Sequence, residues 1–101
     1  DIDGRIIEWD DQKNEINKRK HGISFQDAGL IFADSNMLEF YDELHSDEEE
    51  RYIGIGKVDK VLFVVYTERP EHNATRLISA RLANARERRL YNGGKNWTET
   101  N

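Results

Sequence analysis

The sequence contains no cysteine and only one proline, Pro70. The absence of cysteine excludes disulfide bridges, thiolate zinc sites and a cysteine nucleophile. It is also typical of proteins that work in the reducing cytoplasm, where we expect this chain to act. The longest apolar run, residues 61–66, is far shorter than the roughly 20 residues that span a bilayer. We therefore expect no membrane segment, and no basic-then-apolar signal segment is recognised.

Patterns for metal and nucleotide binding are also missing. The histidines His21, His45 and His72 are scattered, without helical or hairpin spacing. The acidic cluster 47–50 lacks the alternating ligands and the turn glycine of a calcium loop. Glycines 54 and 56 lack the rest of a nucleotide-binding motif, and the serines show no nucleophile elbow. We predict no metal and no cofactor.

What the sequence has in abundance is charge, unevenly distributed along 101 residues, the length of one domain. Between His21 and Glu50 there are nine acidic residues and no Lys or Arg. From Arg51 to Lys95 there are ten Lys or Arg and four acidic residues. This asymmetry suggests that the basic half contacts nucleic acid or a charged protein. Ordinary solvated surface charge is the alternative, with even weight.

The N-terminal residues predict a strand followed by a helix. Residues 6–9 have strand character. Asp10 or Asp11 can cap a helix that continues to about Lys20, because a short carboxylate accepts hydrogen bonds from the free N–H groups of the first turn. Gly22 is placed to end this helix in the left-handed conformation.

A second helix and a series of strands are predicted next. Ser24 and Asp27 form a capping-box pattern that begins a helix ending near Asp34. Residues 61–66 are β-branched and aromatic, which indicates a central strand covered on both faces. The glycines at 54 and 56 leave room for close approach. The other predicted strands are residues 37–41, 51–57 and 74–81.

The C-terminal helix and the fold class follow from the same reasoning. Asn84 and Glu87 form a further cap, beginning a helix that runs through Tyr91. Helices beside a meander of strands predict an α+β domain. We expect a small antiparallel sheet with two N-terminal helices and one C-terminal helix, in a single domain over 1–91. Residues 92–101 are predicted to form a flexible tail.

Phosphate binding is suggested by five arginines within fourteen residues: Arg76, Arg81, Arg86, Arg88 and Arg89. Arg81 is the leading candidate, because an arginine beside a sheet core is costly unless it is paired, and its planar guanidinium binds phosphate through two hydrogen bonds. Strand alternation predicts one face with Leu77, Ser79 and Arg81, and another with Arg76, Ile78 and Ala80. Arg51, which begins a neighbouring strand, is expected to converge on this region.

Metal-free RNA cleavage needs a base for the 2′-hydroxyl, an acid for the leaving 5′ oxygen and cations for the phosphorane. Glu87 and Tyr91 lie four residues apart on one helix face, and His21 ends a basic helix. Each has a structural alternative: Glu87 as a helix cap, His21 bonded to a carbonyl, Tyr91 packed on the sheet. The run Arg86, Arg88 and Arg89 is more simply explained as an exposed helix face.

An ordered set of motifs over residues 7–91 resembles the BrnT toxin family. It consists of Ile7-Glu8-Trp9-Asp10-Asp11-Gln12-Lys13, Asn17, Lys20-His21-Gly22-Ile23-Ser24-Phe25-Gln26-Asp27-Ala28, Ile31-Phe32-Ala33-Asp34, Glu49-Glu50-Arg51-Tyr52, Ile55-Gly56, Leu62-Phe63-Val64-Val65-Tyr66-Thr67, Arg76-Leu77-Ile78-Ser79-Ala80-Arg81, Glu87, Arg88 and Tyr91.

The resemblance implies a RelE-like fold and a metal-independent endoribonuclease that arrests growth. It also implies a BrnA-like ribbon-helix-helix antitoxin, a two-plus-two complex, and operator DNA bound only through the antitoxin. Acid and base are not assigned by it, because RelE-like toxins differ in these residues. The catalytic candidates are His21, Arg51, Arg81, Glu87 and Tyr91, and the RNA-binding candidates are Lys20, Arg76 and Arg88.

Two other functions fit the sequence. A nucleic-acid-binding module without catalysis would show salt-dependent affinity and leave RNA intact. A protein-interaction domain would ignore RNA and use its acidic loop or basic helix to dock a partner.

Overall fold

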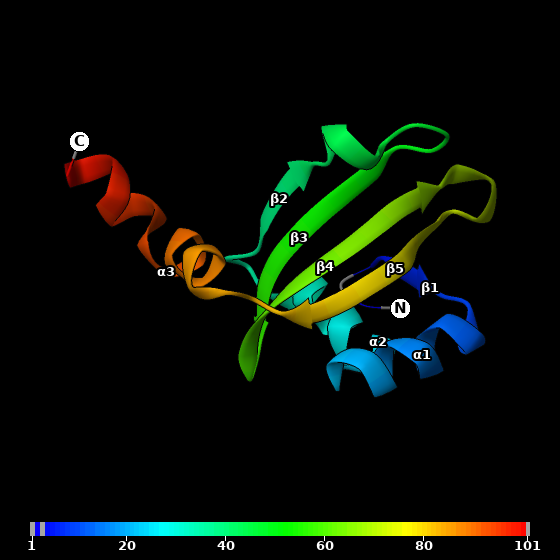
Figure 1. The fold of residues 1–101 in the computed structure, drawn as a ribbon. Coiled ribbons are helices and arrows are strands. Elements are labelled where there is room, and N and C mark those ends of the chain that lie inside the picture. The colour runs from blue at the N-terminus through cyan, green and yellow to red at the C-terminus, as the bar shows by residue number, and fades with distance from the viewer. Residues whose placement is uncertain (1, 3, 101) are drawn as a thin grey trace.

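The computed structural model describes residue 2 and residues 4–100, with side chains as far as Gly93, and contains a five-stranded sheet (Figure 1). The strands are β1 (Ile6–Glu8), β2 (Leu38–Tyr41), β3 (Arg51–Val58), β4 (Lys60–Arg69) and β5 (Ala74–Leu82). Their spatial order is β1-β5-β4-β3-β2, which confirms β4 as the central strand.

The sheet is mixed, and the prediction of a small antiparallel sheet is wrong in this respect. β2 to β5 form the predicted antiparallel meander, but β1 pairs in parallel with β5. Hairpin reasoning applies to strands that follow one another across short turns. It does not apply to β1 and β5, because the strands β2, β3 and β4 lie between them in the sequence.

The helices precede and follow the meander: α1 (Asp11–His21), α2 (Phe25–Ala28), the 3₁₀ helix η1 (Gly29–Ala33) and α3 (Ala85–Thr100). The prediction for α1 is confirmed, since Asp10 accepts hydrogen bonds from the amides of Gln12 and Lys13, and Gly22 has a φ of 74°.

The second predicted helix is confirmed only at its start, where the Ser24 hydroxyl accepts a hydrogen bond from the Asp27 amide. After Ala28 the chain continues as η1, not as α-helix. The buried residues Phe25, Ala28 and Ile31 are three positions apart, and a 3₁₀ helix has three residues per turn. The tighter winding therefore keeps all three side chains in the core.

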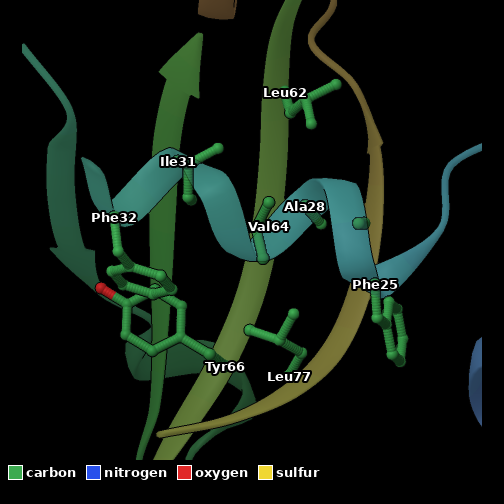
Figure 2. Packing of buried hydrophobic residues seen from close by; sticks show 9 residues of the cluster. Phe25, Ala28, Ile31, Phe32, Leu62, Val64, Tyr66 and Leu77 are labelled. Carbon is green, nitrogen blue, oxygen red and sulfur yellow. The ribbon is translucent and has the colours of Figure 1, made fainter. Parts of the chain in front are cut away.

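The core lies between this helical segment and one face of the sheet (Figure 2). The side chains drawn there include Phe25, Ala28, Ile31, Phe32, Leu62, Val64, Tyr66 and Leu77. The predicted close approach at the glycines of β3 is confirmed: a Cβ on Gly56 would lie 2.8 Å from Cβ of Ile31. Larger residues there would push η1 off the sheet.

The opposite sheet face, here called the open face, is only partly covered, so the prediction that β4 is covered on both sides is wrong. Phe63 and Val65 of β4 point to this face and are half-buried. α1, α2 and η1 leave it free, and α3 reaches only its end, where Tyr91 packs against Ile55 and Val61.

A β-bulge in β5 changes which side chains share a face. Val65 pairs with Ser79 and Tyr66 with Leu77, which leaves Ile78 without a partner. The extra residue breaks the period of two. Leu77 and Ala80 therefore both enter the core, whereas simple alternation placed them on opposite faces. Arg76 and Arg81 both lie on the open face.

α3 is longer than predicted, since it continues past Tyr91 to Thr100. The assignment of 1–91 as the domain and 92–101 as a flexible tail stays a prediction, and residue 101 lies outside the described residues. Among the residues that the structure describes, no helix has the length and apolar character required to cross a membrane.

Candidate active site

Arg81 forms a two-pronged ion pair with Glu87 where β5 ends and α3 begins. Its Nη1 donates to Glu87 Oε1 over 2.8 Å and its Nη2 donates to Oε2 over 2.9 Å. The guanidinium carbon lies 3.9 Å from the ring centroid of Phe63, the residue opposite Arg81 on β4. The predicted need for a partner is thus met, and the guanidinium has a fixed position on the open face.

The pair sets the charge of both groups. Hydrogen bonds from Arg81 lower the pKa of Glu87 from its ordinary value, although burial opposes the shift. The hydrogen bond to Glu87 likewise raises the pKa of Arg81. In the free protein Glu87 is therefore a carboxylate and a weak base.

The same carboxylate also caps α3. Glu87 Oε1 accepts a hydrogen bond of 2.9 Å from the Asn84 amide, and Asn84 Oδ1 accepts one of 2.8 Å from the Glu87 amide. The predicted capping box is confirmed. Capping and pairing with Arg81 coexist, so the first turn of α3 determines where the guanidinium lies.

Tyr91, one helical turn after Glu87, faces the same end of the sheet. Its ring packs against the cluster of Ile55, Val61 and Ala83, which confirms the packing interpretation. Its hydroxyl donates a 2.6 Å hydrogen bond to Asp34 Oδ2. Burial and this hydrogen bond raise the pKa of Tyr91 to about 12, so the phenol holds its proton firmly.

Asp34 is the acceptor that fixes Tyr91. Burial alone would raise the pKa of its carboxyl group, but the hydrogen bonds from Tyr91 and from the amides of Lys57 and Asn36 outweigh burial and lower it. Asp34 is therefore ionised and links the end of η1, the end of β3 and α3.

His21 is carried toward Arg81 by α1. Asn17 bonds both backbone groups of Ala80, the neighbour of Arg81 on β5. His21 follows Asn17 by four residues, one turn or about 6 Å further along the helix axis. No hydrogen bond from the His21 ring to a described residue is present, so the carbonyl-bonded alternative is not seen within that part of the chain.

Arg51 does not converge on Arg81. Phe63 on β4 pairs with Arg81 on one side and with Ile55 of β3 on the other. Arg51 lies four residues before Ile55 on β3, which is roughly 13 Å along the strand. Arg51 is instead 3.7 Å from Glu49. Its catalytic role stays a prediction.

The match to known proteins extends over these elements. A family model described as the ribonuclease toxin BrnT of a type II toxin-antitoxin system matches residues 9–87. The chain belongs to the BrnT family. It is accordingly a ribonuclease toxin of a type II toxin-antitoxin system, and membership in such a system implies an antitoxin partner.

A solved structure supports the BrnT fold. The crystal structure of the ribonuclease toxin BrnT from Brucella abortus is similar with a TM-score of 0.61 and 24% sequence identity, and the match covers 79% of this chain and 97% of that one. At this identity the likeness shows the fold alone, and the RelE-like comparison stays a prediction. No curated protein matches the sequence.

The predicted RNA-binding residues of this BrnT-family toxin lie on three different elements, α1, β5 and α3. Lys20 is exposed on α1 beside His21. Arg76 lies on the open face, with its Nε 2.8 Å from Glu8 Oε2. Arg88 donates to the carbonyl of Ala83 over 2.8 Å. Arg88 directly follows Glu87 of the Arg81–Glu87 pair in the sequence.

Potential metal ligands are not grouped in the described part of the chain, where no three His, Asp or Glu side chains are placed to hold an ion. The exposed helix face predicted for the arginines of α3 is confirmed, because Arg86, Arg88 and Arg89 are all exposed.

Two residues of the site were not predicted. Phe63 lies within an apolar run that gives no sign of contact with an arginine; only the register of β4 with β5 places it under Arg81. Asp34 lies inside a family motif, but nothing in its spacing connects it to Tyr91, 57 positions later.

Proposed function

We propose that this BrnT-family toxin is a cytoplasmic, metal-independent endoribonuclease that cleaves RNA at Arg81 and arrests growth. A BrnA-like ribbon-helix-helix antitoxin neutralises it in a two-plus-two complex and alone contacts operator DNA. The observation that carries the proposal is the two-pronged pair of Arg81 and Glu87.

A phosphate group can take the place of the Glu87 carboxylate on Arg81. Both anions present two oxygens to the parallel N–H groups of a guanidinium. The Arg81 side chain is 36% exposed, whereas that of Glu87 is 13% exposed, so an incoming strand of RNA reaches the guanidinium first. Phe63 beneath it keeps the guanidinium in place during the exchange.

The exchange supplies the base. When Arg81 binds the scissile phosphate, Glu87 loses the hydrogen bonds that lower its pKa and becomes a stronger base. It then removes the proton of the 2′-hydroxyl, whose oxygen attacks phosphorus. The bond to the 5′ oxygen breaks, leaving a cyclic phosphate, while Arg81 stabilises the charge on the phosphorane.

His21 is assigned as the acid that protonates the leaving 5′ oxygen. α1 brings it toward the end of β5 that carries Arg81. Tyr91 is less suited, because its proton is held by Asp34 and its pKa is raised to about 12. Lys20 and Arg88 flank His21 and Glu87 in the sequence and contact neighbouring phosphates in this proposal, and Arg76 extends the path along the open face.

Cleavage of purified RNA in EDTA tests the proposal. We expect the parent protein and the variant Arg89→Ala, which changes an exposed arginine of the same helix, to fragment RNA. Arg81→Ala, folded by circular dichroism, should leave it intact. Cleavage by folded Arg81→Ala contradicts the proposed site, and cleavage that EDTA abolishes contradicts metal independence.

If no protein cleaves purified RNA, ribosome-bound messenger is the next substrate. Strong salt-dependent binding with intact RNA on both substrates would favour the non-catalytic binding module instead.

A further inference from the structure

β2 is an edge strand with free main-chain groups. Among the residues that the structure describes, its only neighbour is β3, and no element lies beyond it (Figure 1). The Asp42 amide donates inward to the Arg51 carbonyl over 2.9 Å. The backbone N–H and C=O groups of successive residues in an antiparallel strand point to alternate sides. Those of Phe40 therefore point toward β3, as the Asp42 amide does, whereas those of Glu39 and Tyr41 point away from the sheet.

This edge has only part of the usual protection. Exposed edges are commonly blocked by short strands, charged side chains, proline or a bulge; β2 is four residues long and carries Glu39, but it has no lysine, proline or bulge. Large apolar side chains are exposed there instead: Phe40 is 42% exposed, Tyr41 50% and Leu44, just after the strand, 84%. The opposite edge of the sheet is better protected. Where β1 ends, the Asn17 side chain forms hydrogen bonds with both backbone groups of Ala80 on β5.

An acidic segment, residues 42–50, follows the edge directly. It contains six Asp or Glu residues. Two of them have cationic partners, Asp42 with His45 and Glu49 with Arg51 and Arg69. The remaining four form no ion pair with any side chain that the structure describes: Glu43, Asp47, Glu48 and Glu50.

We infer that the β2 edge binds an extended segment of the antitoxin, in which basic and apolar residues alternate, as a sixth strand. The outward groups of Glu39 and Tyr41 supply its main-chain hydrogen bonds. Apolar side chains of the segment share one face and cover Phe40 on the open face, while basic side chains on the other face lie beside Tyr41 and neutralise the acidic segment. The inference rests on the proposed function for the existence of a proteinaceous antitoxin, and names the surface that receives it.

Charge disfavours the other occupants of this edge. In antiparallel pairing of two copies, the acidic segment of each would approach Asp34 and the start of β2 in the other, which is repulsive. RNA phosphates would meet the same negative charge. Arg81 lies on β5, three strands away or roughly 14 Å. Binding at this edge is therefore separable from cleavage.

A model peptide tests the inference. The probe is a blocked peptide of about eight residues that alternates Lys and Val, with two controls: the same peptide N-methylated on one backbone edge, and its Glu–Val counterpart. We expect the Lys–Val peptide to bind the full chain and to slow amide hydrogen exchange at Glu39 and Tyr41. Both controls should bind at least about tenfold more weakly.

Two variants locate the binding. Tyr41→Pro removes an outward N–H that makes no bond within the sheet, whereas Tyr41→Thr keeps it; Glu39 is left intact because Tyr66 donates to its carboxylate. We expect about a tenfold loss of affinity for Tyr41→Pro relative to Tyr41→Thr, with RNA cleavage by both unchanged.

Several results would overturn the inference: no binding up to about 1 mM peptide, equal binding of the Glu–Val peptide, or equal affinity of the two variants. Self-association in sedimentation that Tyr41→Pro abolishes would assign the edge to a second copy. If the parent protein binds the peptide but does not cleave RNA, the proposed function is rejected and the β2 edge is still supported as a binding surface.

Discussion

The hydroxyl of Tyr91 donates a 2.6 Å hydrogen bond to Asp34 Oδ2, which joins α3 to the end of η1. Asp34 also accepts hydrogen bonds from the amides of Asn36 and Lys57, so its carboxylate is held from three sides. Glu87 lies one turn before Tyr91. The position of α3, and with it that of the Glu87 carboxylate on Arg81, therefore depends on the residue that ends η1.

The first prediction concerns this link. Tyr91→Phe keeps the ring packed but removes a hydrogen bond to a charged acceptor, and we expect the free energy of unfolding to fall by about 1.5 kcal/mol in urea titrations. Cleavage should fall by less than about tenfold, because Tyr91 positions α3 and is not the acid. Tyr41→Phe, at an exposed site, should change neither quantity. A loss of cleavage of roughly 100-fold or more would instead make Tyr91 the acid.

The second prediction separates the two roles of Glu87. Glutamine also serves at the third position of a capping box, so Glu87→Gln should keep the start of α3 while removing the negative charge beside Arg81. Because the pair is partly exposed, we expect a stability loss of only about 1 kcal/mol. Cleavage should fall roughly 100-fold or more, as for a missing general base.

Glu71→Gln is the matched control for this variant, since Glu71 is exposed and lies 3.8 Å from Arg69 in a surface pair. It should cleave like the parent protein. Full activity of Glu87→Gln would show that Glu87 is a cap and not a base.

The features that the sequence predicts well are those formed by residues close to one another in the chain. The caps at Asp10, Ser24 and Asn84 and the left-handed Gly22 involve groups a few residues apart, and all are present. Arg81 was predicted to need a partner and has one, six residues away.

What the sequence does not predict depends on long-range geometry. The parallel pairing of β1 with β5 joins residues more than 60 positions apart. The bulge at Ile78 is visible only when β4 and β5 are aligned, and it reverses the expected face of Ala80. The separation of Arg51 from Arg81 follows from the register of three strands.

The third prediction concerns acid stability. The hydrogen bonds from Arg81 lower the pKa of Glu87 below its ordinary value of 4.5. The unfolded chain therefore binds a proton first as the pH falls, and the stability contributed by Glu87 is complete above about pH 4.5 and is lost below it, through the folded-state pKa.

Unfolding free energies of the parent and of Glu87→Gln, compared from about pH 6 to about pH 3, measure this contribution. The difference between the two proteins should be constant above about pH 4.5 and shrink below it. Asp34 and Glu8 have pKa values lowered in the same direction, but they are present in both proteins and cancel. A difference that does not change with pH would contradict the Arg81–Glu87 ion pair.

The fourth prediction concerns Asn17, whose side-chain amide forms the hydrogen bonds to β5 that a neighbouring strand would otherwise form. Its Oδ1 accepts from the Ala80 amide over 3.1 Å, and its Nδ2 donates to the carbonyls of Ala80 and Ile23 over 2.8 and 2.9 Å. Asn17→Ala leaves these buried backbone groups without partners. Since each unsatisfied group costs roughly 1–3 kcal/mol, we expect a loss of about 3 kcal/mol in the free energy of unfolding.

Lys18→Ala is the control, because Lys18 is the next residue of α1 and forms only a surface pair with Glu15 at 3.4 Å. Its stability should change by no more than about 0.5 kcal/mol. The anchored helix also carries His21 toward Arg81, so Asn17→Ala should reduce RNA cleavage at temperatures where it remains folded, and Lys18→Ala should not. If Asn17→Ala lost stability but cleaved like the parent, the docking of α1 on β5 would matter for the fold alone, and His21 would not be the acid.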